Sequence, residues 1–288
     1  MKVVLSPNPY RDLGLKAAQS AKKVLDHSGV ESVICLPFSL EEHSRVDIPP
    51  QVCLAPLAEE LPGAAMLLCF GGDGTILHAA KDANPYHIPI LGVNMGSVGF
   101  MAELEHGELS LLSRLVSGKY ELEDRMMLDV AVRREGKVIY SDTALNDAVL
   151  TKGAVARVLD LDVTGDRVLI TSFSGDGVII ATPTGSTAYS LAAGGPIVEP
   201  TAKNIIVTPI CAHSLKVKPM VLDRKRTVGI RLEQGSRRSA YLSVDGGKTL
   251  RLNMCDVVTI KKSKLETRLV RLNDRSFYDV VNMKFRKG

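Results

Sequence analysis

The chain has 288 residues, of which 45% are hydrophobic and 24% are charged, which is typical of a globular protein large enough for two domains. Its formal net charge is only +4, it lacks tryptophan and 5% of its residues are aromatic, so the composition argues against a nucleic-acid-binding protein. The first apolar run stops at Pro7 and Pro9, too short for a signal peptide, and nowhere do about twenty apolar residues run uninterrupted. We therefore expect a cytoplasmic protein with no membrane partner.

The five cysteines do not form a recognisable metal or disulfide pattern. No two of them have CxxC spacing, and the chain contains no HExxH motif. Cys35, Cys69 and Cys211 stand beside aliphatic residues, which predicts buried thiols in a reducing compartment.

Strand and helix patterns alternate through the first 120 residues or so. Within residues 12–27, Ala17, Ala21 and Leu25 recur every four positions, which indicates an amphipathic helix that Gly29 is suited to end. Such alternation predicts a mostly parallel sheet covered on both faces. The expected strands are residues 2–5, 32–38, 64–70 and 88–93, and the further expected helices begin after the glycines at 71–74 and span 109–118.

After about Tyr120 the apolar residues alternate in twos, as at Leu128, Val130 and Val132. Turn signals separate these segments, which predicts an antiparallel, strand-rich domain. The final segment, 276–285, again has helical spacing and is expected to pack on the first domain. The expected strands of this half are 138–142, 158–163, 167–173, 177–183, 227–233, 240–247, 249–253, 257–262 and 267–272, with one short helix at 187–195.

The sequence LLCFGGDGTILHAA, residues 67–80, places glycines and one carboxylate between an apolar strand and a helix. Glycines at such a junction let the backbone approach a ligand, and the N–H groups of the helix favour an anion such as phosphate. A carboxylate repels phosphate, so Asp73 fits better as a base for a hydroxyl, a ribose ligand or a ligand of Mg²⁺. The alternative is that Asp73 only caps the helix that begins near Thr75.

A second segment, residues 174–200, is rich in glycine and hydroxyl side chains and places Asp176 between two glycines. Its TPTGST run carries four hydroxyls just ahead of the short predicted helix, where they can line a phosphate or ribose site. The alternative is a polar connection between strands.

Two further places could meet a ligand. Asn146 and Asp147 set an amide beside a carboxylate, a pair that can bind a sugar diol or an adenine edge but that is also common in turns and caps. Asn94 and Gly96 follow the strand 88–93, where open α/β sheets place their ligand crevice. Phe100 beside them is either an aromatic wall for a base or a core residue.

Several common nucleotide and catalytic motifs are missing. In the partial P-loop match at Gly246–Thr249, Leu242 stands where the first glycine belongs. No GxGxxG follows the first strand, and the chain contains no GxSxG. A nucleotide site in this chain would therefore be built differently.

Taken together, these segments resemble the NAD kinase family. Their order and separation agree with the family over essentially the whole chain. GGDG also occurs in phosphofructokinases and in lipid kinases related to diacylglycerol kinase, whereas TPTGSTAYS is much more specific. The matching segments are SPNP at the start, GGDGT (71–75), Asn146–Asp147, DGVIIATPTGSTAYSLAAGGPIV (176–198) and VDGG around Asp245.

The resemblance implies a fold and an activity. The fold is an α/β plus all-β chain, with a Rossmann-like α/β nucleotide-binding domain over 1–120, completed by 273–288, and an antiparallel β-sandwich over 121–272 that binds NAD. The activity is transfer of the ATP γ-phosphoryl group to the 2′-hydroxyl of the adenosine ribose of NAD, giving NADP. ATP and NAD are then the partners, Mg²⁺ carried by ATP is the metal cofactor, and the chain forms a homo-oligomer, a dimer or tetramer.

The resemblance also implies roles for individual residues. Asp73 is the proton acceptor, Gly74 lies against the substrate, and His78 lies near phosphates, unless it is only a surface residue of the helix. Asn146 and Asp147 bind the ribose and base region of NAD, where many relatives carry the longer Glu in the second position. The remaining implied nucleotide-binding residues are Arg157, Asp176, Thr187, Ala188, Tyr189, Ser190 and Cys211.

Two other functions remain alternatives at this stage. A lipid kinase of the diacylglycerol kinase type would share GGDGT and a strand-rich second domain, but it has no reason to carry TPTGSTAYS. An NAD(P)-binding regulator that has lost catalysis would keep the nucleotide-binding segments, and the presence of Asp73 argues against it.

Overall fold

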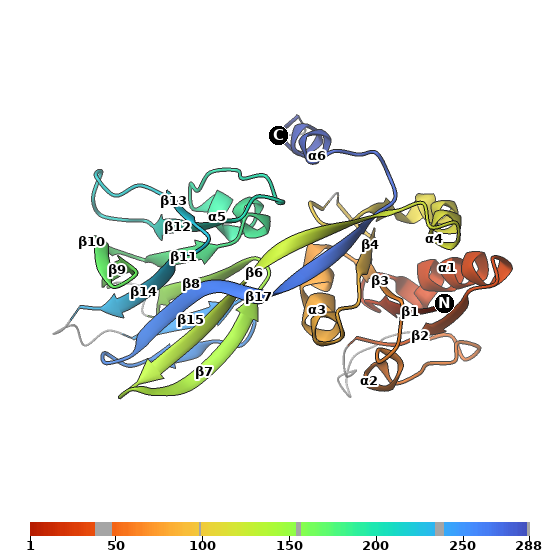
Figure 1. Cartoon of the computed structure of the whole chain (residues 1–288), viewed down its shortest axis with the longest axis horizontal. Coiled ribbons are helices and arrows are strands. Elements are labelled where there is room, and N and C mark those ends of the chain that lie inside the picture. The colour runs from red at the N-terminus through yellow and green to blue at the C-terminus, as the bar shows by residue number, and fades with distance from the viewer. Residues whose placement is uncertain (38–47, 98, 154–156, 234–238, 287–288) are drawn as a thin grey trace. The chain divides into compact units, whose positions relative to one another are not determined.

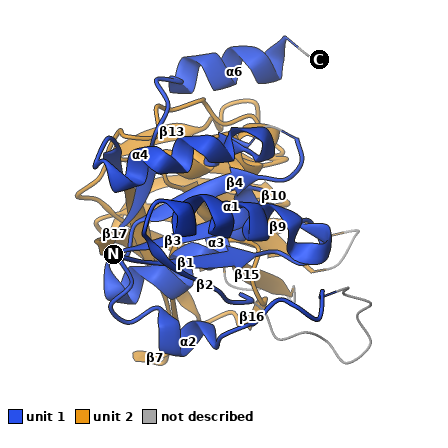
Figure 2. Cartoon of the chain, turned by 90° about the vertical axis from the view of Figure 1, so that its right-hand side faces the viewer, with its two compact units in different colours: residues 1–124, 267–288 blue, residues 125–266 orange. Residues whose placement is uncertain are grey.

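The structure is a computed structural model that describes residues 1–37, 48–97, 99–153, 157–233 and 239–286. The chain divides into two compact units (Figure 2): unit 1 is Met1–Asp124 with Thr267–Gly288, and unit 2 is Arg125–Glu266. The chain passes from one unit to the other inside two long strands, β6 (Glu121–Arg134) and β17 (Val257–Arg271). The boundaries expected from the sequence, after residues 120 and 272, fall just before β6 and just after β17, four and six residues from the boundaries of the two units.

Unit 1 is built on a parallel sheet in the order β2-β1-β3-β4 (Figure 1). The short strand β5 and the end of β17 both pair with β4 in parallel, the latter through Leu269 and Ile90. All six residues of β3 are buried, as expected for a parallel strand covered on both faces. The bounds are β1 Lys2–Pro7, β2 Glu31–Ile34, β3 Met66–Gly71, β4 Ile90–Asn94 and β5 Leu104–Glu105. Phe38, in the expected second strand, lies outside the described residues.

Two helices of unit 1 begin later or are shorter than the periodicity predicts, whereas the helix expected after the glycines at 71–74 begins earlier, at Asp73. The helix expected from Asp12 starts instead with a 3₁₀ turn and becomes α-helical at Lys16, because the Asp12 carboxylate accepts hydrogen bonds from the backbone N–H groups of Ala17 and Ala18, both at 2.9 Å. The helix expected over 109–118 is divided between the end of a 3₁₀ segment, at Leu112, and a short α-helix, Ser113–Val116. The helices are η1 Leu13–Leu15, α1 Lys16–His27, α2 Leu57–Glu60, α3 Asp73–Ala83, η2 Asn84–Tyr86, η3 His106–Leu112, α4 Ser113–Val116 and α6 Phe277–Phe285.

The C-terminal segment of unit 1 is held by Glu103, whose side chain is almost fully buried. Its carboxylate accepts hydrogen bonds from the backbone N–H groups of Leu272 at 2.8 Å and Asn273 at 2.6 Å, and forms an ion pair with Arg271 at 3.0 Å. The helix α6 that follows contributes no buried residue. Its contact with the rest of unit 1 includes the ring of Phe277, whereas Phe285 is 54% exposed.

Unit 2 is a β-sandwich of antiparallel strands. One sheet has the order β13-β12-β11-β8-β15-β16, and the other contains β10-β9-β14-β17 with β6 and β7. The alternating residues Leu128, Val130 and Val132 of β6 share one core with Val178 and Ile180 of β11. The bounds are β7 Lys137–Ala144, β8 Asp147–Lys152, β9 Leu159–Gly165, β10 Val168–Gly175, β11 Gly177–Ala181, η4 Thr184–Thr187, α5 Tyr189–Ala192, β12 Asn204–Ile210, β13 Met220–Asp223, β14 Thr227–Leu232, β15 Ala240–Val244 and β16 Leu250–Leu252.

The opposite face of the six-stranded sheet is also covered. Val149, Ile179 and Ile206 form a second cluster there, against which Ala193 and Val198 pack. Segment 182–200 is therefore folded onto the sheet, and all five residues of β11 are buried between it and the sandwich core. The helix expected over 187–195 is shorter in the structure, with the 3₁₀ turn η4 before a single helical turn, α5.

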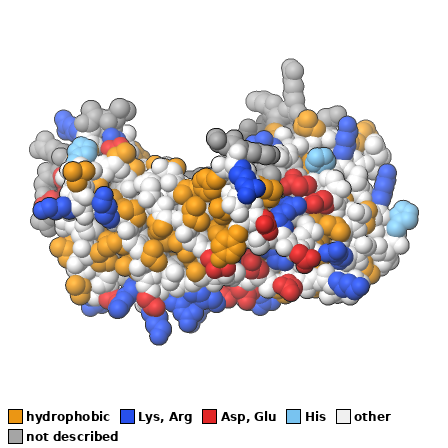
Figure 3. All heavy atoms as spheres, turned by 90° about the horizontal axis from the view of Figure 1, so that it is seen from above, with side chains coloured by type: hydrophobic (Ala, Val, Ile, Leu, Met, Phe, Trp, Pro, Cys, Tyr) orange, Lys and Arg blue, Asp and Glu red, His pale blue; other side chains and the backbone are white. Residues whose placement is uncertain are grey.

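The surface and the cysteines bear on two of the sequence expectations. On the face shown in Figure 3, Asp and Glu side chains lie among the Lys and Arg side chains. Cys35 and Cys69 are buried as predicted, but Cys211 is exposed because it follows the end of β12 in a left-handed conformation, with a φ of 46°. None of the described helices is long and apolar enough to cross a membrane.

Candidate active site

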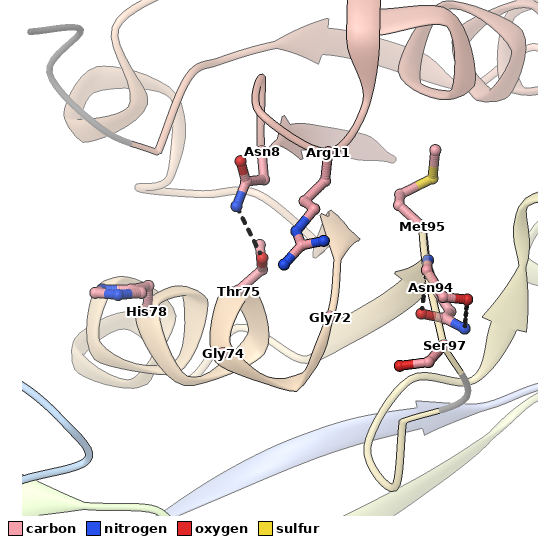
Figure 4. Close-up of a pocket in the computed structure, with 10 residues that line it drawn as sticks. Asn8, Arg11, Gly72, Gly74, Thr75, His78, Asn94, Met95 and Ser97 are labelled. Atoms are coloured by element: carbon pink, nitrogen blue, oxygen red, sulfur yellow. Dashed lines mark hydrogen bonds between the residues drawn. The ribbon is translucent and has the colours of Figure 1, made fainter. Parts of the chain in front are cut away.

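A cavity of about 330 Å³ opens at the carboxyl ends of three strands of unit 1. β1 pairs with β2 on one side and with β3 on the other, so the order of the sheet reverses beside β1. Ligands of open α/β sheets bind outside the carboxyl ends of the strands at such a point. The cavity is lined by Asn8, Arg11, Gly72, Gly74, Thr75, His78, Asn94, Met95, Gly96 and Ser97 (Figure 4).

The glycines of GGDGT shape the floor of this cavity. A Cβ on Gly71 would lie 2.1 Å from the Thr75 hydroxyl oxygen, so only glycine fits there. A Cβ on Gly72 or Gly74 would meet no described atom within 4 Å, so packing does not require these two glycines. They leave open space beside the backbone at the start of α3, where a ligand can approach closely.

Asp73 does not cap the helix. The N-cap of α3 is Gly72, and the Asp73 carboxylate points to another loop, where it accepts hydrogen bonds from the backbone N–H groups of Phe100 at 2.9 Å and Met101 at 3.1 Å. Gly99 lies so close that an added Cβ would be 2.2 Å from Asp73 Oδ1. The capping alternative is therefore wrong, and the carboxylate is held in one orientation by a loop that follows β4.

The side chains of Arg11 and His78 border the cavity. His78 is exposed one turn along α3, and Arg11 follows β1, with its guanidinium directed toward the segment from Gly72 to Thr75 in Figure 4. Asn8 donates a hydrogen bond to Thr75 Oγ1 at 3.3 Å and so ties the end of β1 to α3. The sequence did not single out Arg11, although its place just beyond the first strand of an α/β unit is a usable signal.

The loop that holds Asp73 is itself braced. Asn94 Oδ1 accepts a hydrogen bond from the Gly96 N–H at 3.2 Å, and Asn94 Nδ2 donates to Glu105 Oε2 at 2.8 Å. Phe100 is half-buried, with the Phe277 ring centroid 6.2 Å away and the Lys284 ammonium 4.4 Å above its own centroid. Phe100 is thus packed by α6 rather than inserted into a core, and its role toward a base stays a prediction.

In unit 2, Asn146 and Asp147 lie where β7 leads into β8. Hydrogen bonds connect them to the TPTGS run, residues 182–186. The Thr182 N–H donates to the Asn146 carbonyl at 2.8 Å, and its hydroxyl donates to the Leu145 carbonyl at 2.5 Å. A Cβ on Gly185 would lie 2.1 Å from the Asn146 carbonyl oxygen. The TPTGS run is therefore part of one hydrogen-bonded unit with the Asn146–Asp147 pair, not merely a polar connection.

The Asn146 side chain carries a buried polar atom that points to a ligand. Among the residues that the structure describes, Asn146 Oδ1 has no hydrogen-bond partner. Leaving a buried acceptor unsatisfied is costly, so such an atom is typical of a site that a ligand or a water completes.

Asp147 is only 5% exposed, and its burial, together with the negative charge of Asp245, raises its pKa from 3.8 to about 7. The folded chain therefore keeps this proton at pH values where the unfolded chain has lost it. This stronger binding of the proton stabilises the folded chain. The contribution is fully present below about pH 4 and is lost as the pH rises through about 7.

We expect Asp147→Asn to be more stable than the unmodified chain at pH 8, by on the order of a few kcal/mol, because the variant buries no charge there. At pH 4 to 5 the two chains should differ much less, since Asp147 is then protonated. Thermal unfolding of both chains between pH 4 and 8 checks this. Parallel stability curves would show that Asp147 titrates normally.

The other predicted residues of unit 2 fall into two groups. Thr187, Ala188, Tyr189 and Ser190 follow the TPTGS run, with Tyr189 exposed and the Ser190 hydroxyl buried against Thr208 Oγ1 at 2.8 Å. Asp176 and Cys211 lie at the opposite end of β11, roughly 15 Å from Asp147 at about 3.3 Å per residue. Asp176 there forms an ion pair with Lys152 at 2.6 Å, and Arg157 is exposed before β9. Their roles stay predictions.

Arg125, which the sequence did not indicate, lies beneath the TPTGS run. Its side chain is 1% exposed and donates a hydrogen bond to Thr184 Oγ1 at 3.2 Å. A buried guanidinium is a strong source of positive charge in a poorly solvated place. Its partner lies 59 residues away in sequence, so no local pattern could reveal the contact.

A resident metal ion has no evident protein ligand set in the described part of the chain. There, no group of three or more His, Cys, Asp and Glu side chains lies together in a way that could hold one. The Asp73 carboxylate already accepts hydrogen bonds from two N–H groups. As one carboxylate, it suits a metal ion whose other ligands come from a substrate and from water.

A parallel α/β unit with a glycine-bordered cavity, in one chain with a β-sandwich that carries a buried carboxyl group beside an amide, is typical of a nucleotide-binding protein of the kinase type. Family models for the ATP-NAD kinase N-terminal domain and the ATP-NAD kinase C-terminal domain match residues 23–120 and 145–272. An NAD kinase of Ruminiclostridium cellulolyticum is 37% identical over 284 residues, covering 98% of this chain and 97% of its own. The chain belongs to the ATP-NAD kinase family.

Solved structures agree with this assignment. Yeast NADH kinase, crystallised in complex with NADH, is similar with a TM-score of 0.84 and 25% identity over 100% of this chain and 89% of its own. An NAD kinase from Archaeoglobus fulgidus in complex with ATP is similar in fold, with a TM-score of 0.75 and 24% identity over 100% of both chains. An NAD kinase of Moorella thermoacetica is 42% identical over 231 residues, which is 80% of this chain and 74% of its own.

Proposed function

We propose that this chain transfers the γ-phosphoryl group of ATP to the 2′-hydroxyl of the adenosine ribose of NAD, giving NADP and ADP. The observation that carries the proposal is the orientation of the Asp73 carboxylate by two backbone N–H groups, between Gly72 and Gly74, which line the cavity, in a chain that belongs to the ATP-NAD kinase family. The relatives reported above are described as NAD kinases or an NADH kinase, and none of these observations favours a lipid substrate.

The donor phosphates fit the cavity of unit 1. The open backbone at Gly72 and Gly74 admits phosphate oxygens, and Arg11 and His78 supply cationic or hydrogen-bonding groups at its border. Arg11 is our addition to the residues expected from the sequence.

The acceptor nucleotide fits the hydrogen-bonded unit of Asn146, Asp147 and the TPTGS run. Hydroxyl groups of a ribose can donate to the buried Asn146 Oδ1 and exchange hydrogen bonds with the Asp147 carboxyl. The ordered segment from Thr187 to Ser190, with its exposed Tyr189, is proposed to contact the same nucleotide.

In the reaction, the 2′-hydroxyl oxygen forms a bond to the γ-phosphorus while the bond from that phosphorus to the bridging oxygen of ADP breaks. The hydroxyl proton passes to the Asp73 carboxylate, whose N–H partners Phe100 and Met101 hold it in place. Phosphoryl transfer depends mainly on positioning and charge neutralisation, which this arrangement supplies. A divalent ion bound to ATP, which we take to be Mg²⁺, neutralises part of the phosphate charge.

One assay tests the proposed function. Purified protein is incubated with NAD, ATP and Mg²⁺, and NADP is detected with an NADP-specific dehydrogenase. NADP formation supports the proposal, and its absence with both ATP and polyphosphate as donors would contradict it. Diacylglycerol in place of NAD serves as the control for the lipid kinase alternative.

Gly185→Ala should raise the KM for NAD by about 10-fold or more, because the new Cβ cannot fit 2.1 Å from the Asn146 carbonyl oxygen and must push the pair out of place. The KM for ATP should change little. Steady-state kinetics in both substrates check this. Gly107→Ala is the control, because the added methyl meets nothing within 4 Å. Gly136→Ala would not serve, because Gly136 has a φ of 80°, at which alanine is strained. Equal KM values for NAD in Gly185→Ala and Gly107→Ala would contradict the expectation.

Two properties expected from the family resemblance are also proposed, namely a homo-oligomer and a location in the cytoplasm. Light scattering on the purified protein, and fractionation of the cells that produce it, test them directly.

A further inference from the structure

The Asp245 carboxylate forms hydrogen bonds with the backbone of the Asn146–Asp147 connection. It follows β15 in a left-handed conformation, with a φ of 48°. Its Oδ2 accepts a hydrogen bond from the Leu145 N–H at 2.8 Å. Its Oδ1 accepts two, from the N–H groups of Asn146 at 2.8 Å and Asp147 at 3.0 Å. One carboxylate thus takes up three successive backbone donors.

The connection is also bonded from its other side and along its backbone. The Asp245 N–H donates to the Asp147 carbonyl at 3.0 Å, and the Thr182 N–H donates to the Asn146 carbonyl at 2.8 Å. Three consecutive residues therefore have their peptide groups fixed by β15 and by the TPTGS run. What the connection leaves for a ligand are the two side chains, the Asn146 amide and the Asp147 carboxyl.

Asp245 also places a charge next to Asp147. Its three N–H donors compensate the negative charge of Asp245, whereas the Asp147 carboxyl beside it is only 5% exposed. Burial first and the charge of Asp245 second raise the pKa of Asp147 to about 7. Near neutral pH Asp147 is thus present both as an acid, which donates a hydrogen bond, and as a carboxylate, which only accepts.

We propose that Asp245 is a positioning residue for the acceptor nucleotide: its carboxylate holds residues 145–147 in the conformation in which Asn146 and Asp147 bind the sugar. The inference rests on the proposed function and deepens it, because it assigns the geometry of NAD binding to a residue that need not touch NAD.

The test compares Asp245→Asn with Asp166→Asn. Asparagine tolerates a positive φ as well as aspartate does, so neither variant strains its turn. Asp166 is a matched control in the same unit: its φ is 50°, and its carboxylate accepts hydrogen bonds from the Thr227 N–H at 2.9 Å and from Arg226 at 2.7 Å. Calorimetry gives the dissociation constant of NAD without ATP from pH 6 to 9, and kinetics give kcat and both KM values.

For Asp245→Asn we expect NAD binding to weaken by about 10-fold, since one acceptor oxygen becomes an amide NH₂ that faces backbone N–H groups. The KM for ATP should stay within about twofold, because that substrate is assigned to unit 1. The midpoint of the pH dependence of NAD binding should move to lower pH, because the charge that raises the pKa of Asp147 is gone. Asp166→Asn should match the unmodified chain in all three.

Unchanged NAD affinity and an unchanged pH midpoint in a folded Asp245→Asn would overturn the inference while leaving the proposed function in place. Equal losses in NAD and ATP binding would show a merely structural role and would overturn it too. If Asp245→Asn does not fold, Asp245→Gly, which has no strain at this φ, is measured in its place with the same expectations. An unmodified chain that binds no NAD would overturn the proposed function itself, and the inference with it.

Discussion

Asp73→Asn is expected to lower kcat by about 10²–10⁴-fold while the chain still folds and binds NAD. The amide cannot accept the proton of the ribose hydroxyl, so the reaction loses its base. The variant keeps one oxygen that can accept from the N–H of Phe100 or Met101, whereas its NH₂ faces the other N–H. We therefore expect a small loss of thermal stability and a large loss of turnover, with the KM for NAD changed little.

The measurement is NADP formation by the variant under saturating NAD and ATP, with calorimetric binding of NAD as a second readout. Asp26→Asn is the matched control: it makes the same chemical change on the exposed surface of α1, where Asp26 pairs with Lys22 at 3.2 Å. It should retain full turnover. Turnover in Asp73→Asn within about threefold of the unmodified chain would show that another group, or solvent, accepts the proton.

The sequence was a good guide to the sheet of unit 1 because parallel strands are buried on both faces and so appear as uninterrupted apolar runs. Met66–Gly71 is such a run, and every residue in it is buried. The alternation in Leu128–Val132 likewise predicted a strand with one face in the sandwich core. Both patterns are local, and the structure keeps them.

Element ends were predicted less well, because they depend on single tertiary contacts. The start of α1 is set by Asp12 reaching the N–H groups of Ala17 and Ala18, which periodicity does not contain. The passages between the two units lie within β6 and β17. The sequence predicted two strands, 257–262 and 267–272, where the structure has the single strand β17, and it placed the domain boundaries after residues 120 and 272, outside both strands.

The same limit applies to the candidate site. Asp73 and the Asn146–Asp147 pair stand in local patterns that point to nucleotide chemistry, and the sequence identified them. Their orienting partners lie far away in the chain: the Phe100 N–H is 27 residues from Asp73, and Asp245 is 98 residues from Asp147. The Phe100 N–H carries no local signature, because a backbone N–H belongs to every residue except proline. Asp245 stands in the VDGG segment, but no local pattern connects it to Asp147.

Gly99→Ala is expected to reduce kcat by about 10²-fold although it leaves every proposed catalytic group in the chain. The added Cβ would lie 2.2 Å from Asp73 Oδ1 and 2.9 Å from its Cγ. Either the carboxylate turns away or the loop carrying the Phe100 and Met101 N–H groups retreats, and both break the orienting hydrogen bonds. The free energy of unfolding should fall by about 1–3 kcal/mol from overpacking, which thermal denaturation measures.

Gly107→Ala, whose methyl meets nothing within 4 Å, controls for adding a side chain in the same unit and should keep full turnover.

The decisive comparison is the double variant Gly99→Ala with Asp73→Asn. If Gly99 matters because it leaves room for the oriented carboxylate, its substitution has little left to remove once the base is gone, and the double variant should turn over about as slowly as Asp73→Asn alone. Losses that multiply would mean that Gly99 supports the reaction independently of Asp73, for example by placing Phe100.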